Sequence, residues 1–273
     1  MNPTLTLLVI GCGNMGAAIV GGALDKLAGV RIVAVDPDVG RARSLLPEGV
    51  PVELHATSEE ISDLKADLVI LGVKPQTFAQ LSSQTLTLLR TAPVVSIMAG
   101  IGLGRLETVL APAHVVRVMP NLPALVGQGM SLGCTTAALS PQLKATIEAL
   151  FSAIGRFDWV RDEVLFEKAN AVFACGPGFV FAFAEQMILA AEGQGLPRAL
   201  AETLVQQTFL GSAKMLCEDV RGASGLKQAV SSPGGTTLAG LSVLEAATGL
   251  PQLLPGTLAA AHARALELER LAH

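Results

Sequence analysis

The residue types in this sequence that could do chemistry gather in glycine-rich segments. The first segment, Gly11-Cys12-Gly13-Asn14-Met15-Gly16, follows an apolar run and opens a helix-like stretch. Glycines at this spacing allow a tight turn, a close approach of the backbone to a pyrophosphate, and close packing of helix on strand. The free N–H groups and positive dipole end of the helix then face the anion. The pattern predicts a dinucleotide-binding loop; the simpler alternative is a glycine-rich turn without a ligand.

A carboxylate, Asp36, stands twenty residues after Gly16, at the end of the second predicted strand. A carboxylate there can accept a hydrogen bond from the ribose 2′-OH of NAD and would repel a 2′-phosphate. Arg41 and Arg43 follow closely and could instead pair with that phosphate. Alternatively, Asp36-Pro37-Asp38 only forms a turn and caps the next helix. The sequence therefore leaves NADH and NADPH both open.

The second glycine-rich segment runs from Val230 to Thr237 and enters another predicted helix. It places four hydroxyl side chains and two glycines within seven residues, beside the free N–H groups of a helix start. Such a start can hold a carboxylate. Simple capping by Ser or Thr is the alternative, but capping rarely needs so many hydroxyls and glycines. We expect a second binding site here.

Three further loops each follow a predicted parallel strand: Val73–Gln76, Met98–Gly100 and Met119–Asn121. The carboxyl ends of such strands line the ligand crevice of an open α/β sheet. Lys74 could reach a ribose or phosphate there, and Asn121 could fix an amide. An ordinary connection remains the alternative for any one of these loops.

Histidine and cysteine do not form a site in this sequence. Cys12, Cys134, Cys175 and Cys217 lie far apart, without a CxxC pair or a nearby histidine to complete a zinc site. The four histidines are equally scattered, so neither a metal site nor a catalytic triad is expected.

The elements that must position these segments change in type near residue 160. Before it, short apolar runs alternate with helical patterns, which is typical of a mostly parallel sheet covered on both faces. After it, only helical patterns follow. We therefore expect an α/β Rossmann-type domain over residues 1–160 and an all-α domain over residues 161–273. The predicted strands are Leu5–Ile10, Val30–Val35, Leu68–Gly72, Val94–Ile97, Val115–Val118 and Gly155–Val160. The predicted helices are Met15–Leu27, Gly40–Leu46, Ser58–Leu64, Gln76–Leu89, Leu103–Leu110, 141–153, Asp162–Phe173, Phe179–Glu192, Arg198–Asp219, Thr237–Ala247 and Pro255–Leu271.

The composition excludes several classes of partner. The chain has 273 residues, of which 51% are hydrophobic and 15% charged, with a net charge of −4. It is therefore not expected to be disordered or to bind nucleic acid. The uncharged stretches Leu5–Leu24 and Val118–Leu143 are interrupted by glycine, asparagine or proline, and no basic residue precedes the first. We predict a soluble cytoplasmic protein without a membrane partner.

The excess of apolar residues falls in the C-terminal helices. Between Gly222 and Ala263 only Lys227 and Glu245 are charged, and the stretch between Ala169 and Pro197 contains only two glutamates. Such helices have little polar face to offer water. We expect an obligate homodimer interface there, with the second glycine-rich segment at or near it.

From about residue 5 to 270, the sequence resembles the pyrroline-5-carboxylate reductase family. Five segments carry the resemblance, and the last is the most specific: Gly11–Gly16, Val73–Gln76, Met98–Gly100, Arg117–Pro123, and Ser232–Thr237 followed by Gly240 and Leu244-Glu245. The family reduces the cyclic imine Δ1-pyrroline-5-carboxylate to L-proline, the last step of proline biosynthesis. The resemblance implies NADPH or NADH as cofactor, this imine as substrate, and a dimer that often joins a larger ring of dimers.

The resemblance also implies roles for individual residues. The pyrophosphate would lie on Ile10, Gly11, Cys12, Gly13, Asn14 and Met15, and the adenosine ribose near Asp36. The nicotinamide half would be lined by Val73, Lys74, Pro75, Met98, Ala99 and Gly100. The substrate would be held by Val230, Ser232, Gly235, Thr236 and Thr237. We expect Thr237 to be the catalytic residue, since an electrophilic imine needs only a hydroxyl that orients its nitrogen or relays a proton.

Two departures from the family pattern and two rival functions stay open. The chain has Ala174-Cys175-Gly176-Pro177-Gly178-Phe179 where the family usually has Gly-Ser-Gly-Pro-Ala-Tyr, and Gln228 where an acidic residue is common. These changes bear on substrate geometry.

One rival function is that of a β-hydroxyacid dehydrogenase, which needs a lysine and an asparagine four residues apart on one helix face, whereas Lys168 and Asn170 are two apart. The other is a non-catalytic nucleotide sensor, which would not need the second segment.

Overall fold

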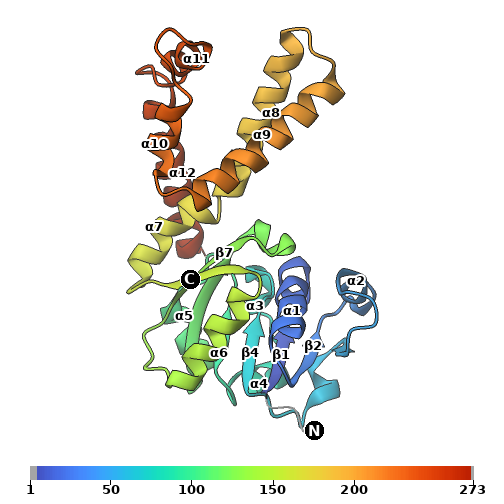
Figure 1. Cartoon of the computed structure of the whole chain (residues 1–273). Coiled ribbons are helices and arrows are strands. Elements are labelled where there is room, and N and C mark those ends of the chain that lie inside the picture. The colour runs from blue at the N-terminus through green and yellow to red at the C-terminus, as the bar shows by residue number, and fades with distance from the viewer. Residues whose placement is uncertain (1–4, 272–273) are drawn as a thin grey trace. The chain divides into compact units, whose positions relative to one another are not determined.

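The structure is a computed structural model that describes residues 5–271, drawn in Figure 1. It contains two compact units. One holds the described residues up to Cys175 together with those from His262 onward, and the other holds Gly176–Ala261. The helix that follows residue 160 therefore belongs to the first unit, and the functional boundary at residue 160 stays a prediction.

The first unit is built on one eight-stranded sheet in the order β3-β2-β1-β4-β5-β6-β7-β8. Strands β1 to β6 are parallel to one another, while β7 runs antiparallel to β6 and β8 runs parallel to β7. The 3-2-1-4-5-6 part is the strand order of dinucleotide-binding sheets. The strands are β1 (Leu5–Ile10), β2 (Val30–Val35), β3 (Val52–His55), β4 (Leu68–Leu71), β5 (Val94–Ser96), β6 (Val115–Pro120), β7 (Gly129–Cys134) and β8 (Gly155–Trp159).

Helices cover both faces of this sheet, as predicted. On one face, α1 and α6 pack on alternate strand residues such as Leu7 and Ile70. On the other face, α4, α5 and α7 pack on the intervening residues, such as Leu8 and Val69. The helices of this unit are α1 (Asn14–Lys26), α2 (Val39–Leu45), η1 (Ser58–Ile61), α3 (Pro75–Phe78), α4 (Ser83–Leu89), α5 (Leu103–Leu110), η2 (Leu122–Val126), α6 (Pro141–Ser152) and α7 (Glu163–Phe173).

Three local features differ from the predicted elements. Strands β3 and β7 were not expected, because β3 is short and carries a charge, and β7 contains two glycines. A Cβ on Gly133 would lie only 2.7 Å from the ring of Phe157, so the aromatic ring requires that glycine. The single helix expected over Gln76–Leu89 is two helices, since the Ser82 hydroxyl accepts a hydrogen bond from the Thr85 amide and starts α4 anew.

The second unit consists of helices alone. It contains α8 (Gly176–Gly193), α9 (Arg198–Glu218), α10 (Gly222–Ala229), α11 (Thr236–Leu244) and most of α12 (Leu250–Leu271). Figure 1 shows α8 and α9 as a hairpin of two long helices. Helix α10 was not predicted, because its two glycines and small residues weaken the periodic pattern, and α12 begins five residues before the expected Pro255.

The apolar residues of this unit are largely uncovered within one chain. Helices α8, α10 and α11 have no buried residue, and large side chains such as Phe181, Leu210 and Val243 are 57%, 66% and 73% exposed. By length and composition, the helical stretch Glu163–Gly193 would also be long and apolar enough to cross a membrane. This stretch is part of the region in which we predict the dimer interface.

Candidate cofactor and substrate sites

The ends of four parallel strands are aligned at one edge of the sheet. The register pairs Ile10 with both Val35 and Leu71, and Leu71 with Ser96. The loops that follow β1, β4 and β5 therefore emerge side by side. The strand order reverses between β1 and β4, and a crevice outside such a reversal is where α/β sheets bind ligands.

Gly11 and Gly16 form the tight turn between β1 and α1. Gly11 has a φ of +94°, and a Cβ there would lie 2.7 Å from the carbonyl carbon of Gly72 in the loop after β4. A Cβ on Gly16 would lie 2.5 Å from the carbonyl oxygen of Gly11. These two glycines are thus required by the close approach of the chain to itself.

Gly13 has a different role, because the space beside it is open. Within residues 5–271, and apart from its two chain neighbours, no atom lies within 4 Å of the position that a Cβ on Gly13 would take. Gly13 is also the N-cap of α1, and no side chain caps that helix. The first N–H groups of α1 are therefore left to an external acceptor. An open approach to an uncapped helix start fits a pyrophosphate.

Asp36 contacts the same loop. Its Oδ2 accepts a hydrogen bond from the Cys12 amide at 2.9 Å, and its Oδ1 accepts one from the Asp38 amide at 3.0 Å. Burial, reinforced by the charge of Asp36, raises the pKa of the Cys12 thiol to about 11, so this thiol is neutral and inert. The capping role expected in this turn falls to Asp38, which accepts from the Arg41 amide at the start of α2.

The two arginines after Asp36 are held differently. Arg43 donates a hydrogen bond from Nη2 to the Val52 carbonyl oxygen at 2.9 Å, which ties its side chain to β3. The Arg41 side chain is exposed, and the hydrogen bonds and ion pairs of residues 5–271 do not include its guanidinium. Arg41 is therefore the arginine that remains available to a phosphate.

The loops after β4 and β5 present small or flexible groups. Lys74 is exposed and directly precedes Pro75, the first residue of α3. In the next loop, Met98 is buried, Ala99 is exposed, and Gly100 has a φ of +72°. The two loops are hydrogen bonded at their bases, where Ile97 donates to the Leu71 carbonyl oxygen at 3.0 Å.

Asn121 is buried, and its amide already has partners within the chain. Its Nδ2 donates to the Phe173 carbonyl oxygen at 3.0 Å, and its Oδ1 accepts from the Met130 amide at 2.8 Å. The side chain thus joins the end of β6 to β7 and to α7. Its predicted contact with a cofactor stays a prediction.

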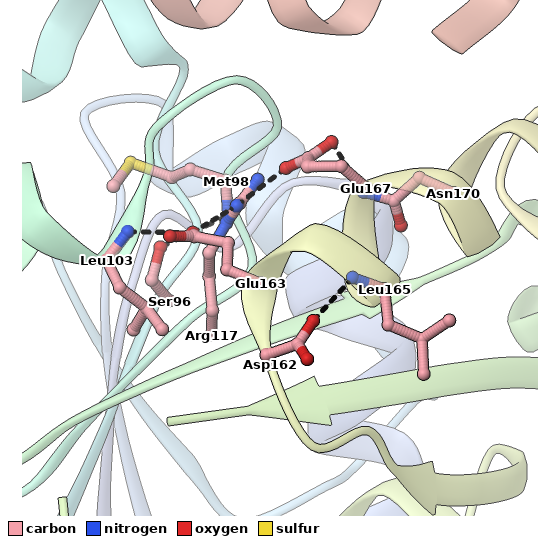
Figure 2. A network of polar contacts seen from close by, with 9 residues as sticks. All are labelled: Ser96, Met98, Leu103, Arg117, Asp162, Glu163, Leu165, Glu167 and Asn170. Atoms are coloured by element: carbon pink, nitrogen blue, oxygen red, sulfur yellow. Dashed lines mark hydrogen bonds and ion pairs between the residues drawn. The ribbon is translucent and has the colours of Figure 1, made fainter. Parts of the chain in front are cut away.

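A buried ion-pair network near this edge was not anticipated. Arg117 lies in the middle of β6, is 1% exposed, and pairs with Glu163 and Glu167 of α7 (Figure 2). The sequence did contain a signal. An arginine within an apolar strand must find a buried anion, and two glutamates four residues apart lie on one helix face.

The second glycine-rich segment lies entirely in the second unit. Gly234 has a φ of +71°, and Gly235 is the N-cap of α11, which no side chain caps. A Cβ on Gly235 would lie 2.5 Å from the Ser232 hydroxyl, so glycine lets that hydroxyl approach the helix start. Thr236 and Thr237 are exposed, as is Val230, and no hydrogen bond among residues 5–271 uses either threonine hydroxyl. The segment combines free N–H groups with free hydroxyls, which suits a carboxylate.

Comparison with the sequences of known proteins shows the family to which this chain belongs. Residues 163–268 match the family model described as pyrroline-5-carboxylate reductase dimerisation. The pyrroline-5-carboxylate reductase of Pseudomonas aeruginosa is 34% identical to this chain over 268 residues, which cover 97% of each protein. The chain belongs to the pyrroline-5-carboxylate reductase family. The stretch of exposed apolar helices is thus the dimerisation region of a reductase of this family, as expected from its composition.

Solved structures of this family have the same fold. A pyrroline-5-carboxylate reductase from Coxiella burnetii superimposes with a TM-score of 0.87 at 30% identity and covers 97% of this chain and 98% of its own. The enzyme from Plasmodium falciparum, solved with NADP bound, gives a TM-score of 0.81 at 25% identity over 98% of this chain and its entire own chain. Residues 6–100 match the model described as NADP oxidoreductase coenzyme F420-dependent.

The departures from the reductase pattern lie around the start of the second unit and on α10 within it. Ala174 is the C-cap of α7, Cys175 is exposed, and α8 begins at Gly176. Gln228 is exposed on α10, shortly before the second glycine-rich segment. In the part of the chain that the structure describes, no group of three or more His, Cys, Asp or Glu side chains is placed to hold a metal ion.

Proposed function

We propose that this chain reduces Δ1-pyrroline-5-carboxylate to L-proline with NADPH or NADH. The observation that carries the proposal is the pair of uncapped helix starts, α1 after Gly13 and α11 after Gly235. One suits a pyrophosphate and the other a substrate carboxylate. Membership of the reductase family joins the two in one reaction.

The cofactor would be held by the first unit. Ile10 to Met15 would surround the pyrophosphate, Asp36 or Arg41 would meet the adenosine ribose, and Val73–Pro75 with Met98–Gly100 would line the nicotinamide half. The open space beside Gly13 fits such a group. When bound, the reduced nicotinamide supplies a hydride.

The substrate would be held by the second unit. Ser232, Thr236 and the free N–H groups at the start of α11 would bind the carboxylate, beside Val230 and Gly235. The Thr237 hydroxyl would orient the imine nitrogen or relay a proton to it from water. Binding and orientation are the main tasks of the protein here, since a protonated imine is already electrophilic.

The dehydrogenase alternative is weakened by the positions of two residues on α7. Lys168 is exposed, whereas Asn170 is buried and donates a hydrogen bond to Glu167 at 3.2 Å. One side chain lies in solvent and the other in the protein interior, so the two are not placed to contact one substrate together. A non-catalytic sensor would leave the free hydroxyls of the second segment without a purpose.

The assembly we propose is an obligate homodimer in the cytoplasm that joins a larger ring of dimers. Exposed apolar side chains on α8, α9, α11 and α12 support the dimer, because one chain leaves them in water. Size-exclusion chromatography with light scattering tests it. A soluble, fully active monomer in dilute solution would contradict the proposal.

The activity is tested by following the absorbance of the reduced nicotinamide with pyrroline-5-carboxylate, using NADPH and NADH in turn. We expect turnover with the imine and none with a 3-hydroxy acid and oxidised cofactor. Thr237→Ala should lower kcat/KM for the imine by roughly 10²-fold, the lower range for a general acid–base group. Thr257→Ala is the control, because that hydroxyl donates to Leu253 within α12. Wild-type kcat/KM in Thr237→Ala would remove the role of Thr237.

A further inference from the structure

The loop between β5 and α5, residues 97–102, is held at its end by a residue of another element. Helix α5 begins after Gly102, which has no side chain to cap it. Instead, Glu163 of α7 accepts a hydrogen bond from the Leu103 amide at 2.8 Å through Oε1. A glutamate sixty residues away therefore takes the place of an N-capping side chain for α5. Its negative charge also interacts favourably with the positive end of the helix dipole.

The same carboxylate oxygen is fixed by Arg117. The Arg117 Nη1 lies 2.5 Å from Glu163 Oε1 and 2.6 Å from Glu167 Oε1, and the guanidinium lies 4.7 Å from the centre of the Phe166 ring. Figure 2 shows the contacts of Arg117 with the two glutamates, with Glu163 between Arg117 and Leu103. The two carboxylates keep the pKa of Arg117 raised although its burial alone would lower it. The position of Glu163 is thus determined by a buried, charged partner.

The two glutamates differ in one respect. Glu167 bonds to Arg117 and accepts from Asn170 at 3.2 Å, so its partners lie on β6 and on its own helix. Only Glu163 adds a bond to the loop region. The last turn of α12 contacts this loop as well, because a Cβ on Gly100 would lie 3.7 Å from the Cβ of Leu268, and Glu269 Oε1 occupies the space beside Gly102.

We propose that Glu163, a residue of the dimerisation region, is a positioning residue that holds the loop between β5 and α5, residues 97–102, in the conformation that binds the nicotinamide half of the cofactor. The dimerisation match begins at this residue and ends at Leu268, so both ends of the matched region contact the loop. The loop is thereby held by two segments of the region that matches the dimerisation model. The inference rests on the proposed function for the identity of the ligand at this loop.

Two measurements on the full-length protein test the proposal, with Glu163→Ala, Glu163→Gln and Glu167→Gln compared with wild type. The first is hydrogen exchange of residues 97–103 without any ligand. The second is the Kd of the reduced cofactor, measured by its fluorescence, beside the Kd of 2′,5′-ADP, which represents the adenosine half alone.

Glu163→Ala should speed exchange in residues 97–103 and weaken binding of the reduced cofactor roughly tenfold, while the Kd of 2′,5′-ADP stays unchanged. Glu163→Gln keeps an acceptor for the Leu103 amide and should restore most of both properties. Glu167→Gln loses the same charge beside Arg117, so it should lower thermal stability while leaving loop exchange and cofactor Kd at wild-type values.

A loss of cofactor affinity in Glu167→Gln as large as that in Glu163→Ala would overturn the proposal, because loss of charge beside Arg117 would then explain both. Unchanged exchange in Glu163→Ala, or an equal loss of 2′,5′-ADP binding, would also overturn it. Failure of the proposed function is seen separately, as a wild-type protein that binds the cofactor without reducing the imine.

Discussion

The backbone amide of Cys12 donates a hydrogen bond to Asp36 Oδ2 at 2.9 Å, which joins the glycine-rich loop after β1 to the end of β2. Asp36 therefore has a structural task beside its proposed contact with the adenosine ribose. Its second oxygen is engaged by the Asp38 amide. A test of its role in cofactor choice should keep the bond to the Cys12 amide, which joins the two strand ends.

Asp36→Asn removes the negative charge and retains a side-chain oxygen for the Cys12 amide. Because the carboxylate repels a 2′-phosphate, the substitution should raise the ratio of kcat/KM with NADPH to that with NADH. The expected change is roughly tenfold, equivalent to about 1.4 kcal/mol. Steady-state kinetics with both cofactors measure it. An unchanged ratio would mean that Asp36 does not meet the adenosine ribose.

Arg41 and Arg43 form a matched pair. Arg41→Ala should raise KM for NADPH several-fold and leave KM for NADH unchanged, since its exposed guanidinium can pair with the 2′-phosphate. Arg43→Ala should lower the melting temperature through loss of its bond to the Val52 carbonyl oxygen, without altering the cofactor ratio. The assignment of Arg41 is wrong if the two variants shift the ratio equally.

Gly11 and Gly13 should respond differently to alanine. Gly11→Ala forces a Cβ against the Gly72 backbone at a φ of +94° and should cost on the order of 2–4 kcal/mol of unfolding free energy. The Cβ of Gly13→Ala would meet none of the described residues beyond its chain neighbours, so the substitution should cost about 1 kcal/mol or less. Its methyl group would nevertheless occupy the approach to α1 and weaken cofactor binding at least tenfold. Denaturant unfolding and cofactor titration separate the two effects, and full cofactor affinity in Gly13→Ala would contradict the pyrophosphate assignment.

The buried thiols should make the fold sensitive to alkaline pH. Burial raises the pKa of Cys12 to about 11 and that of Cys134 to about 12, from an ordinary value of 9.0. Above pH 9 the unfolded chain releases these protons while the folded chain retains them, so stability falls as pH rises from 9 through 11 and 12. The slope should be roughly 1 kcal/mol per pH unit for each thiol. Urea unfolding at several pH values measures it, and Cys12→Ala should have a shallower slope between pH 9 and 11.

The sequence predicted the elements around the proposed cofactor site better than the rest of the fold. Strands β1 and β2 begin and end where their apolar runs do, and the glycine spacing placed the turn between β1 and α1 correctly. Periodicity is a local property, so it identifies such elements well. It did not reveal β7, because Gly133 is required by the ring of Phe157, which is distant in sequence.

Long-range pairing accounts for a further part of what the sequence did not predict. Arg117 and Glu163 are 46 residues apart, and no local pattern connects them. The two free hydroxyls at the start of α11 were predictable from their types and spacing. The apolar faces of the same unit, in contrast, have no covering partner within the described chain, so no local pattern could pair them.

The ion pair between Lys227 and Glu245 bears on how two copies meet. These are the only formally charged side chains between Gly222 and Ala263, and they neutralise each other. A surface of this kind produces almost no long-range electrostatic field, so it does not steer an approaching copy. We therefore expect encounter at the unsteered rate of about 10⁵–10⁶ M⁻¹s⁻¹, almost independent of ionic strength. The lifetime of the assembled protein would then depend on slow dissociation rather than on rapid capture.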